Sequence, residues 1–529
     1  MADKTRNPTG WGYVEDALGA SERKAIAPMA GALFGGALPD AQPAPAAETI
    51  ALPGSRLRVP DALSGWVSTG HGDRLLHARG RSFPDLVELR GDALVDVPDA
   101  VAEPGNEQEL MAVLDWCDSR GYAVIPFGGG SSVVGGVTPE GVGDAGAVVT
   151  LSLQKMNAVH DIDARSATVH ADAGILGPGL EAAVKHQGLA VRHFPQSYFH
   201  SSLGGWVATR GAGHFSTQHA KIEDRVQALR IILPDGRICQ TQRLPAGSVG
   251  VDPNRLWCGS EGTLGVISQV WLRCVQAPSL RDGCGIAFAR FEDALEAART
   301  MLQSGIYPTQ LRILDPYEHM VSRMMAGKPA QGALMVLAFE SAGAPVGPQM
   351  AAAQEIAQQH GGSIQDSAGE ESTGDWKNTF FRQPYLRDAM LDHAVVLDTF
   401  ETAVLWSQVP AAYHGIREAV IKALEAECGG GAVTCRVTHA YPDGCCLYFG
   451  FFAAGRRGSL KSQWQAIRDA AAAAVAEYGG TASHHHAMGR THRGYAREEL
   501  PEAFIDALHG ARARLDPRGI MNPGLLPDA

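Results

Sequence analysis

The most informative segment of the chain reads Ile125-Pro126-Phe127-Gly128-Gly129-Gly130-Ser131-Ser132-Val133-Val134-Gly135-Gly136. The apolar run just before the loop, from Tyr122 to Ile125, predicts a buried strand. The glycines remove most Cβ atoms from the loop, so its backbone can adopt positive φ and aim successive N–H groups at one point. Converging amides suit a diphosphate, and Ser131 and Ser132 add hydroxyl donors. Taken by itself, the segment is equally compatible with an ordinary glycine-rich loop.

Two more segments rich in glycine and serine favour a nucleotide-binding loop over an ordinary glycine-rich loop. The second reads Phe194-Pro-Gln-Ser-Tyr-Phe-His-Ser-Ser-Leu-Gly-Gly-Trp-Val-Ala-Thr-Arg-Gly-Ala-Gly213. Within it, Ser202 is placed to cap a helix that begins near Leu203. The third, Gly259-Ser-Glu-Gly-Thr-Leu-Gly-Val-Ile267, predicts a tight turn that leads into a strand ending near Cys274. Three such loops within about 140 residues, each joined to a strand or helix, suit the wrapping of one long nucleotide.

Length and composition limit the remaining possibilities. A chain of 529 residues exceeds what one core normally holds, so we expect at least two domains. The net charge of −12 argues against nucleic acid as a partner. The nine cysteines show no disulfide-like spacing, which favours a reducing compartment. With no apolar leader after Met1 and no run of 18 apolar residues, we expect a cytoplasmic location.

The secondary-structure pattern is mixed. We predict a helix over 107–120, strands over 147–153 and 167–171, a helix over 180–186, and a hairpin over 226–241. The segment Gly141-Val-Gly-Asp-Ala-Gly146 matches GxGxxG, but it leaves a turn and enters a strand. A Rossmann site needs the reverse order, so we interpret it as a turn.

The second half predicts a separate substrate domain. Strands over 285–288, 310–314 and 333–340 alternate with helices over 291–302, 316–325 and 348–359, and a further helix is expected over 501–515. This order favours one antiparallel sheet beneath helices, and an α+β fold overall. Residues 434–449 predict a hairpin that turns at Pro442-Asp443-Gly444.

Several polar side chains of this half are candidates for chemistry. Arg387, expected near the start of a helix, can clamp a phosphate or carboxylate, or it can form a surface ion pair. Tyr448 lies on a strand, where a buried tyrosine is usually structural. His484, His485 and His486 are adjacent, but no Glu or Cys lies at ligand spacing, so we predict no metal and favour acid–base or hydrogen-bonding service.

The three loops, in this order over about 95–277, resemble the PCMH-type flavin-binding domain of the vanillyl-alcohol-oxidase superfamily. The resemblance implies FAD, with the first loop on its diphosphate. Relatives often tether the flavin through a His in that loop, and this loop has none, so we expect non-covalent FAD. The cofactor contacts implied are Pro126, Phe127, Gly128, Gly129, Gly130, Ser131, Ser132, Gln196, Ser197, Tyr198, Ser201, Ser202, Gly205, Thr209, Arg210, Glu261, Gly262, Thr263, Leu264, Gly265, Val266 and Ile267.

Motifs outside that domain are similar to the alkyldihydroxyacetonephosphate synthase family. They are Trp11-Gly-Tyr13, Leu311-Arg-Ile313, Tyr385-Leu-Arg-Asp388, Phe400-Glu-Thr402, Thr434-Cys-Arg-Val-Thr438, Leu447-Tyr-Phe449 and Ser483-His-His-His486. That family exchanges the acyl group of acyl-dihydroxyacetone phosphate for a fatty alcohol, without net redox. The resemblance implies Tyr448 as acid/base, Arg387 as phosphate clamp, Arg312 as a further functional arginine and the three histidines as a polar wall.

The same resemblance sets expectations about organisation and partners. We predict an N-terminal segment over 1–94 that packs on the cap, an FAD-binding domain over 95–277, a cap over 278–480, and a C-terminal segment over 481–529 that completes the active site. Acyl-dihydroxyacetone phosphate and a fatty alcohol are the expected partners. Peripheral membrane contact and a homodimer are kept open. The region after Arg312 is short compared with the membrane-facing region of animal relatives, which weakens the case for membrane docking.

A D-2-hydroxyacid dehydrogenase on the same fold is the alternative. Such enzymes share the ending Asp516-Pro-Arg-Gly-Ile-Met-Asn-Pro-Gly524, but they carry His-x-Gly-Asp-Gly-Asn and Glu-His-Gly-Ile-Gly. This chain has His439-Ala-Tyr-Pro-Asp-Gly444 and Ser483-His-His-His-Ala-Met-Gly489 instead, which lacks the acidic ligand and favours the synthase. A flavin-free binding protein is disfavoured because all three loops are intact.

Overall fold

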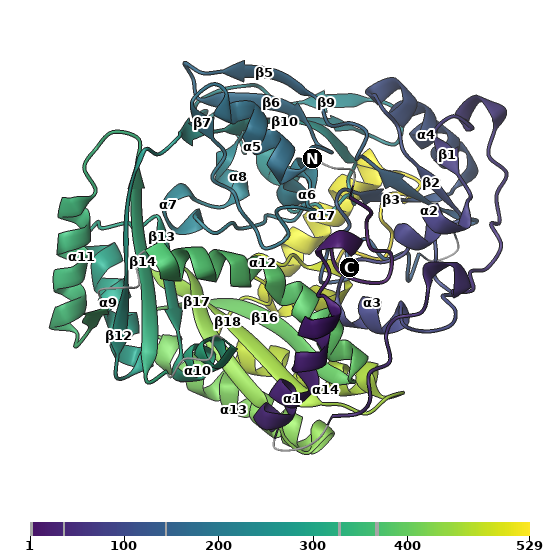
Figure 1. Ribbon diagram of the computed structural model, residues 1–529. Coiled ribbons are helices and arrows are strands. Elements are labelled where there is room, and N and C mark those ends of the chain that lie inside the picture. Colours follow the sequence, from purple (N-terminus) through teal and green to yellow (C-terminus); the bar gives the residue numbers. More distant parts are fainter. Residues whose placement is uncertain (1–3, 35–37, 143–144, 326–329, 366–369, 529) are drawn as a thin grey trace.

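The computed structural model describes residues 4–34, 38–142, 145–325, 330–365 and 370–528 (Figure 1). In Figure 1, an upper part contains the three glycine-rich loops, and a lower part is built on one large sheet. The fold is α+β with an antiparallel cap sheet, as predicted.

The upper part holds two main sheets. The first has the order β1 (Val67–Ser68), β2 (Ala100–Ala102), β4 (Val148–Ser152) and β3 (Ala123–Phe127), with β2, β4 and β3 parallel. The second is antiparallel, in the order β5 (Val159–Asp163), β6 (Thr168–Asp172), β10 (Val266–Arg273), β8 (Val226–Ile232) and β9 (Ile238–Gln240). A short pair joins β7 (Leu189–Ala190) to β11 (Val275–Gln276).

The helix α4 shows how local sequence positions the first loop. It spans Glu107–Arg120 as predicted, because Asn106 accepts a hydrogen bond from the Glu109 amide and Gly121 ends the helix with φ 66°. Its apolar face is buried and packs in the same core as β4. The chain then enters β3, so the glycine loop leaves the sheet at the carboxyl end of a buried parallel strand, where ligands commonly bind in α/β sheets.

The lower part is the cap. Its sheet has seven antiparallel strands in the order β15 (Ser363–Gln365), β12 (Leu280–Phe288), β14 (Ala333–Ser341), β13 (Gln310–Leu314), β17 (Ala432–Ala440), β18 (Gly444–Ala454) and β16 (Val395–Leu405). The hairpin predicted around Pro442 to Gly444 is therefore β17–β18.

One irregularity of this sheet positions the site. Val437 lies opposite Leu447, but His439 lies opposite Cys446, so Thr438 is an extra residue in β17. A bulge of this kind re-aims side chains and is frequent near active sites. Here Thr438 and His439, although adjacent in the strand, both line the same cavity.

The helices of the cap agree closely with the periodicity of the sequence. α9, α10 and α11 confirm three predicted helices, and β13 has the predicted bounds. One expectation was wrong: Arg387 does not lie near the start of a helix, because α12 begins at residue 370 and continues past Pro384. The cap helices are α9 (Phe291–Gln303), α10 (Pro316–Met325), α11 (Gly347–Gln359), α12 (Glu370–Asp392), α13 (Val409–Cys428) and α14 (Leu460–Glu477).

The other helices belong to the upper part and to the two ends of the chain. They are α1 (Ala20–Phe34), α2 (His71–Leu76), α3 (Phe83–Glu88), α5 (Gly177–Lys185), α6 (Leu203–Ala208), α7 (Ser216–His219), α8 (Ile222–Arg225), α15 (Gly489–His492), α16 (Ala496–Glu499) and α17 (Glu502–Leu515). None of the helices in the described ranges has the length and apolar character needed to cross a bilayer.

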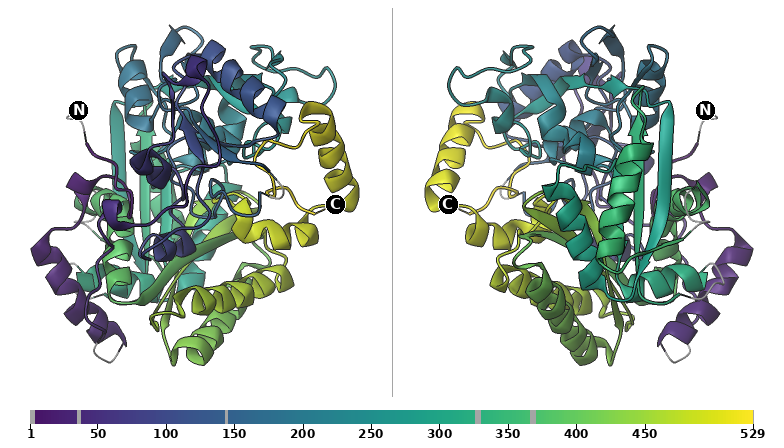
Figure 2. Two further views of the ribbon diagram at one scale, coloured as in Figure 1. Left: turned by 90° about the vertical axis from the view of Figure 1, so that its right-hand side faces the viewer. Right: turned by 90° about the vertical axis from the view of Figure 1, so that its left-hand side faces the viewer.

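Segments from both ends of the chain connect the two parts. Near the N-terminus, Leu75, Phe83 and Leu86 are buried in the hydrophobic core of the cap, while β1 joins the first sheet of the upper part. In Figure 2 the yellow C-terminal segment runs along one side of the molecule between the two parts. Met521 pairs with Val124 along the outer edge of β3, so residues from the far end of the sequence protect that edge.

The predicted turn over 141–146 is only partly testable. Gly141 has φ 64°, and the segment leads into β4, as the interpretation as a turn requires. Residues 143–144 lie outside the described residues.

Candidate active site

The first glycine loop is packed so closely that side chains are excluded from it. A Cβ on Gly129 would lie 1.6 Å from the carbonyl oxygen of His200, and one on Gly128 would lie 2.2 Å from the Ser202 Oγ. Gly130 adopts φ 66° against the ring of Phe127. The loop and the second segment therefore touch backbone to backbone, which only glycine permits.

The amides of this loop are available to a ligand. Among the described residues, none accepts a hydrogen bond from the backbone N–H of Gly128 to Ser132. Buried N–H groups are nearly always paired, so a row of unpaired amides in a glycine cradle fits the diphosphate of FAD. The Ser132 Oγ accepts from the Gly136 amide at 3.0 Å and so fixes the return of the loop. The residues present thus fit the flavin nucleotide that the sequence predicted.

The C-terminal segment ties the first loop to the third. The side-chain amide of Asn522 donates to the carbonyl oxygens of Gly136 at 3.1 Å and Glu261 at 2.8 Å. The third loop also binds the C-terminal segment through its own side chain, because the Glu261 carboxylate accepts from the amides of Met488 and Gly489 at 3.0 to 3.2 Å. Burial raises the pKa of Glu261 to about 7, although these amides oppose the shift. Sequence reasoning did not single out Asn522, whose partners lie more than 250 residues away.

A cavity of about 200 Å³ lies where the two parts meet. Its upper wall comes from the first two loops and Trp11, and its lower wall comes from the cap sheet and the histidine segment. The polar cap residues that line it are Arg312, Arg436, Thr438, His439, Tyr448, His485 and His486. A larger cavity of about 770 Å³ shares Thr209 with it and is lined by Arg210, Glu261 and His484 among others.

Some of the predicted cofactor contacts line one of these two cavities, and the others do not. The first is lined by Gly128, Gly129, Gly130, Ser131, Ser132, Gln196, Ser197, Ser201, Ser202, Gly205 and Thr209. The second is lined by Thr209, Arg210, Glu261 and Thr263. Pro126, Phe127, Tyr198, Gly262, Leu264, Gly265, Val266 and Ile267 line neither and support the loops from behind. Leu264, for example, is fully buried in the core.

Tyr448 stands in a row of charged side chains across three strands. The strand register places Glu401 of β16 and Arg436 of β17 on either side of it. The Arg436 guanidinium lies 4.4 Å from the centre of the Tyr448 ring and pairs with Glu318 at 2.6 Å. The Tyr448 hydroxyl lies 2.8 Å from the Thr399 Oγ1. Burial raises the pKa of Tyr448, with Arg436 opposing the shift, so the phenol keeps its proton at neutral pH.

Arg312 supplies a second cation to the same cavity. It is 3% exposed, donates to the Thr438 carbonyl, and lies 3.2 Å from the His214 Nδ1. Burial and the neighbouring Arg436 lower the pKa of Arg312 to about 9, which still leaves it charged at neutral pH. The predicted arginine is thus brought together with Tyr448.

The histidine segment is held by one buried carboxylate. Glu401 accepts hydrogen bonds from the backbone amides of His484, His485 and His486 and from the Ser483 hydroxyl. Burial opposes ionisation, but these donors and the adjacent imidazoles outweigh it and hold the pKa of Glu401 well below its usual range. His485 and His486 face the cavity, whereas His484 turns to Tyr441, 2.6 Å away. Glu401 stood within a quoted motif, but nothing in the sequence assigned it this role.

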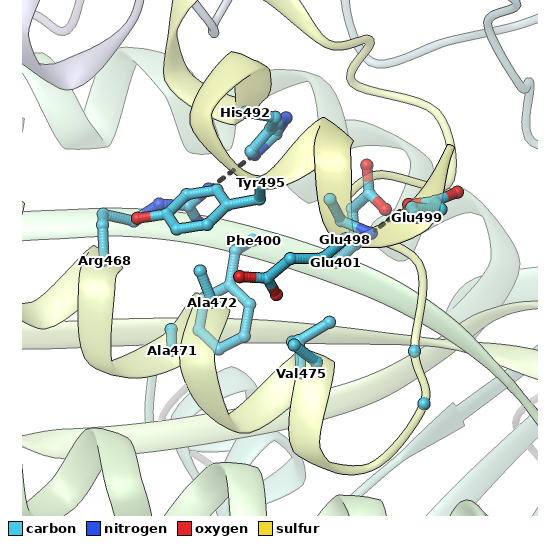
Figure 3. Close-up of a pocket in the computed structure, with 14 residues that line it drawn as sticks. Phe400, Glu401, Arg468, Ala471, Ala472, Val475, His492, Tyr495, Glu498 and Glu499 are labelled. Atoms are coloured by element: carbon cyan, nitrogen blue, oxygen red, sulfur yellow. Dashed lines mark hydrogen bonds between the residues drawn. The ribbon is translucent and has the colours of Figure 1, made fainter. Parts of the chain in front are cut away.

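A further cavity of about 330 Å³ lies behind Glu401. Figure 3 shows Arg468, His492 and Tyr495 on one side of it and Glu498 and Glu499 on the other. Arg468 donates to the His492 Nε2 at 2.7 Å, and the His492 Nδ1 donates to the Ala487 carbonyl. These bonds fix the turn that follows the histidine segment.

Arg387 is a predicted site residue that the structure places outside this group. It is buried, donates to the Arg81 carbonyl at 2.9 Å, and lies 5.9 Å from the ring of Trp11. It does not line the described cavity, and Trp11 does. Its role as a phosphate clamp therefore stays a prediction, and Arg436 is a cation that the sequence did not single out.

Comparison with known proteins agrees with the geometry. Residues 98–242 match the FAD binding domain family, and residues 278–526 match the family of FAD linked oxidases, C-terminal domain. The chain therefore contains two domains of the kind found in FAD-linked oxidases. Among them it is 28% identical to the alkyldihydroxyacetonephosphate synthase of Trypanosoma brucei brucei over 479 residues, which is 86% of this chain and 77% of the relative. The synthase of Caenorhabditis elegans is 29% identical over 484 residues, covering 86% and 80%.

Other FAD-linked oxidases are also similar to the chain. The mitochondrial D-lactate dehydrogenase [cytochrome] of Arabidopsis thaliana is 26% identical over 444 residues, covering 82% of this chain and 74% of the relative. Among solved structures, an alkyldihydroxyacetonephosphate synthase superposes with a TM-score of 0.82 at 22% identity, covering 98% of both chains. This likeness confirms the fold of both domains.

Proposed function

We propose that this protein is an alkyldihydroxyacetonephosphate synthase-like transferase. It would exchange the acyl group of acyl-dihydroxyacetone phosphate for a fatty alcohol, releasing a fatty acid, with no net oxidation or reduction. One observation carries the proposal: among the described residues that line the 200 Å³ cavity, two are arginines and none is Asp or Glu. A cationic cavity without carboxylates suits a phosphate ester, and the synthases of T. brucei brucei and C. elegans support the assignment.

The residues of the cavity take distinct roles in this proposal. Arg312 and Arg436 hold the phosphate end of the substrate, because both guanidiniums are buried and charged. The Tyr448 Oη carries a proton, since its pKa is raised, and moves it to or from the reacting end of the substrate. His485 and His486 form the polar wall that orients that end. Arg387, the predicted phosphate clamp, lies 5.9 Å from the ring centre of Trp11, which lines the cavity, so we keep it as a further phosphate-binding candidate.

FAD supplies a reversible electrophile to this chemistry when it is bound. We infer that it is held without a covalent bond, because residues 128–132 contain no His or Cys nucleophile. Acid precipitation that leaves the yellow colour in the pellet would refute this. The homodimer remains a prediction that hydrodynamic measurements can test. Peripheral membrane contact remains a prediction that vesicle-binding measurements can test.

Transfer of radiolabelled hexadecanol into alkyl-dihydroxyacetone phosphate tests the proposed reaction. We expect activity in the holoenzyme and its loss in Tyr448→Phe, which removes only the hydroxyl. Tyr495→Phe is the matched control, because that phenol faces the cavity behind Glu401. Arg436→Gln should raise KM for the phosphorylated substrate more than Arg387→Gln does. Full turnover in Tyr448→Phe would show that the site is wrongly assigned.

The D-2-hydroxyacid dehydrogenase remains the second candidate. It is favoured by the likeness to the A. thaliana D-lactate dehydrogenase over 444 residues. Anaerobic mixing with D-lactate or D-2-hydroxyglutarate separates the two functions, because a dehydrogenase bleaches its flavin with such acids. Bleaching, without transfer of labelled hexadecanol, would replace the proposed function by this one.

A further inference from the structure

Four potential metal ligands converge on the inner side of the histidine segment. They are His439 of β17, Cys446 of β18, and His484 and His485. One ligand atom of each lies within 4.8 Å of all the others. The spacing of the sequence argued against a metal, because no Cys lies near the histidine run. The β17–β18 hairpin, which pairs His439 with Cys446, brings both residues to it across the fold. From this convergence we propose that the four side chains bind a divalent transition metal of the zinc type.

Hydrogen bonds to the outer ring nitrogens orient two of the imidazoles. The His439 Nε2 lies 3.0 Å from the Gly213 carbonyl, which can only accept, so this nitrogen carries the proton. The His484 Nε2 lies 2.6 Å from the Tyr441 hydroxyl. Metal-binding histidines almost always donate the outer N–H in this way and offer the other nitrogen to the ion. Both rings therefore turn Nδ1 toward the cluster, where the His439 Nδ1 lies 3.0 Å from the Thr438 Oγ1, a contact that the ion would replace.

The Nδ1 atoms of His484 and His485 face one another at 2.9 Å. With metal–nitrogen bonds of about 2.0–2.1 Å, two nitrogens of a tetrahedral site lie roughly 3.3 Å apart, so a small adjustment accommodates an ion between them. Without an ion, the two nitrogens must share one proton. The facing pair is thus the geometric core of the site.

The chemistry of the ligands selects the class of metal. One thiolate and three imidazoles suit Zn²⁺ or Co²⁺ and do not suit Mg²⁺ or Ca²⁺, which prefer oxygen. As the metal–sulfur bond forms, the Cys446 thiol releases its proton to solvent. The thiolate and the nearby Glu401 carboxylate, 3.8 Å from the His485 Nδ1, then offset the charge of the ion.

Four protein ligands make a closed, structural site and leave no open position for substrate. The ion would fasten the histidine segment onto the β17–β18 hairpin beside Tyr448, whose ring centre is 6.0 Å from that of His485. The ligand geometry does not depend on which reaction the cavity performs. A negative result for metal binding therefore leaves the proposed function standing, and a negative result for the proposed function leaves the metal site standing.

Cobalt substitution of the full-length holoprotein, prepared without a histidine tag, tests the site. After chelation and reloading with Co²⁺, we expect one ion per chain, with ligand-field bands at wavelengths longer than the flavin absorbs and a thiolate-to-cobalt band in the near ultraviolet. Cys446→Ser should abolish the thiolate band and weaken binding at least tenfold, and His484→Gln should lower the stoichiometry. Cys445→Ser is the matched control, because this neighbour is equally buried but not part of the cluster.

Two results would overturn the proposal. One is wild-type protein that takes up less than about a tenth of an equivalent of Co²⁺ and Zn²⁺ by elemental analysis. The other is an identical spectrum and stoichiometry in wild type and Cys446→Ser, which would mean adventitious binding elsewhere. FAD content and circular dichroism of each variant establish that it is folded. If Cys446→Ser fails to fold, His484→Gln gives the same decision.

Discussion

Replacing Glu401 by glutamine keeps the shape of the side chain but removes its charge and one acceptor oxygen. In the structure, one oxygen accepts from the His484 amide, while the other accepts from the amides of His485 and His486 and from the Ser483 hydroxyl. The glutamine oxygen can replace only one of the two. The new NH₂ group then faces at least one buried N–H group that cannot pair with it.

The magnitude follows from those contacts. An unsatisfied buried donor costs about 1–3 kcal/mol, and hydrogen bonds to a charged acceptor contribute about 1.5–3 kcal/mol each. We therefore expect the free energy of unfolding to fall by about 2–4 kcal/mol. If about 1.4 kcal/mol of this loss also raises the activation free energy of the reaction, turnover falls about tenfold.

The assay compares urea unfolding and hexadecanol transfer in Glu401→Gln, Glu499→Gln and wild type. Glu499 is the matched control, because it accepts from Thr481 and the Ala482 amide at the exposed start of the same segment. Glu499→Gln should change stability by less than about 1 kcal/mol, as expected for an exposed interaction. Wild-type stability together with wild-type turnover in Glu401→Gln would refute the view that this carboxylate positions the histidines.

Three further changes test other parts of the structure. Gly129→Ala should abolish FAD binding, because its Cβ would lie 1.6 Å from a carbonyl oxygen, whereas Gly65→Ala, which meets nothing within 4 Å, should keep the full flavin absorbance. Asn522→Asp should weaken FAD binding more than Asn522→Ala, since an acceptor then faces the two carbonyls that the amide now bridges; equal flavin affinity in both would contradict the bridge. Burial raises the pKa of Asp315 from 3.8 to about 6, so its contribution to stability is complete below the unfolded pKa and is lost as the pH rises through the folded one. The loss amounts to about 3 kcal/mol, roughly half of it above pH 5, and Asp315→Asn should remove it. Parallel urea midpoints for wild type and Asp315→Asn from pH 5 to 8 would disprove the shift.

Local periodicity was sufficient for most elements of the fold. Helix α9 and strand β13 were predicted because their apolar spacing is a property of a few consecutive residues. The N-cap of α6 was predicted from Ser202, whose side chain accepts from the Gly205 amide at 3.2 Å. The start of α12 was misplaced because Pro384 lies inside the helix, against the usual preference.

The candidate site depended on contacts that a linear pattern does not contain. A regular hairpin that turns at Pro442 to Gly444 would place Arg436 opposite Phe449. The extra residue at Thr438 shifts the register by one, so Arg436 lies opposite Tyr448 instead. His439 lies opposite Cys446 in either register, because both residues lie between the bulge and the turn. Nothing in the residue types indicates this bulge, which is why the second arginine was missed. The ligand cluster was missed because His484 and His485 meet His439 and Cys446 only in the folded chain.

The bridge made by Asn522 also has a consequence for biosynthesis. The first glycine loop is translated early, but its link to the third loop waits until residue 522 has left the ribosome. At about 5–20 residues per second, the nearly 400 intervening residues take roughly 20–80 s. During that interval the nascent chain holds an unfinished nucleotide cradle. Loading of the flavin is thus expected to wait until residue 522 has been synthesised.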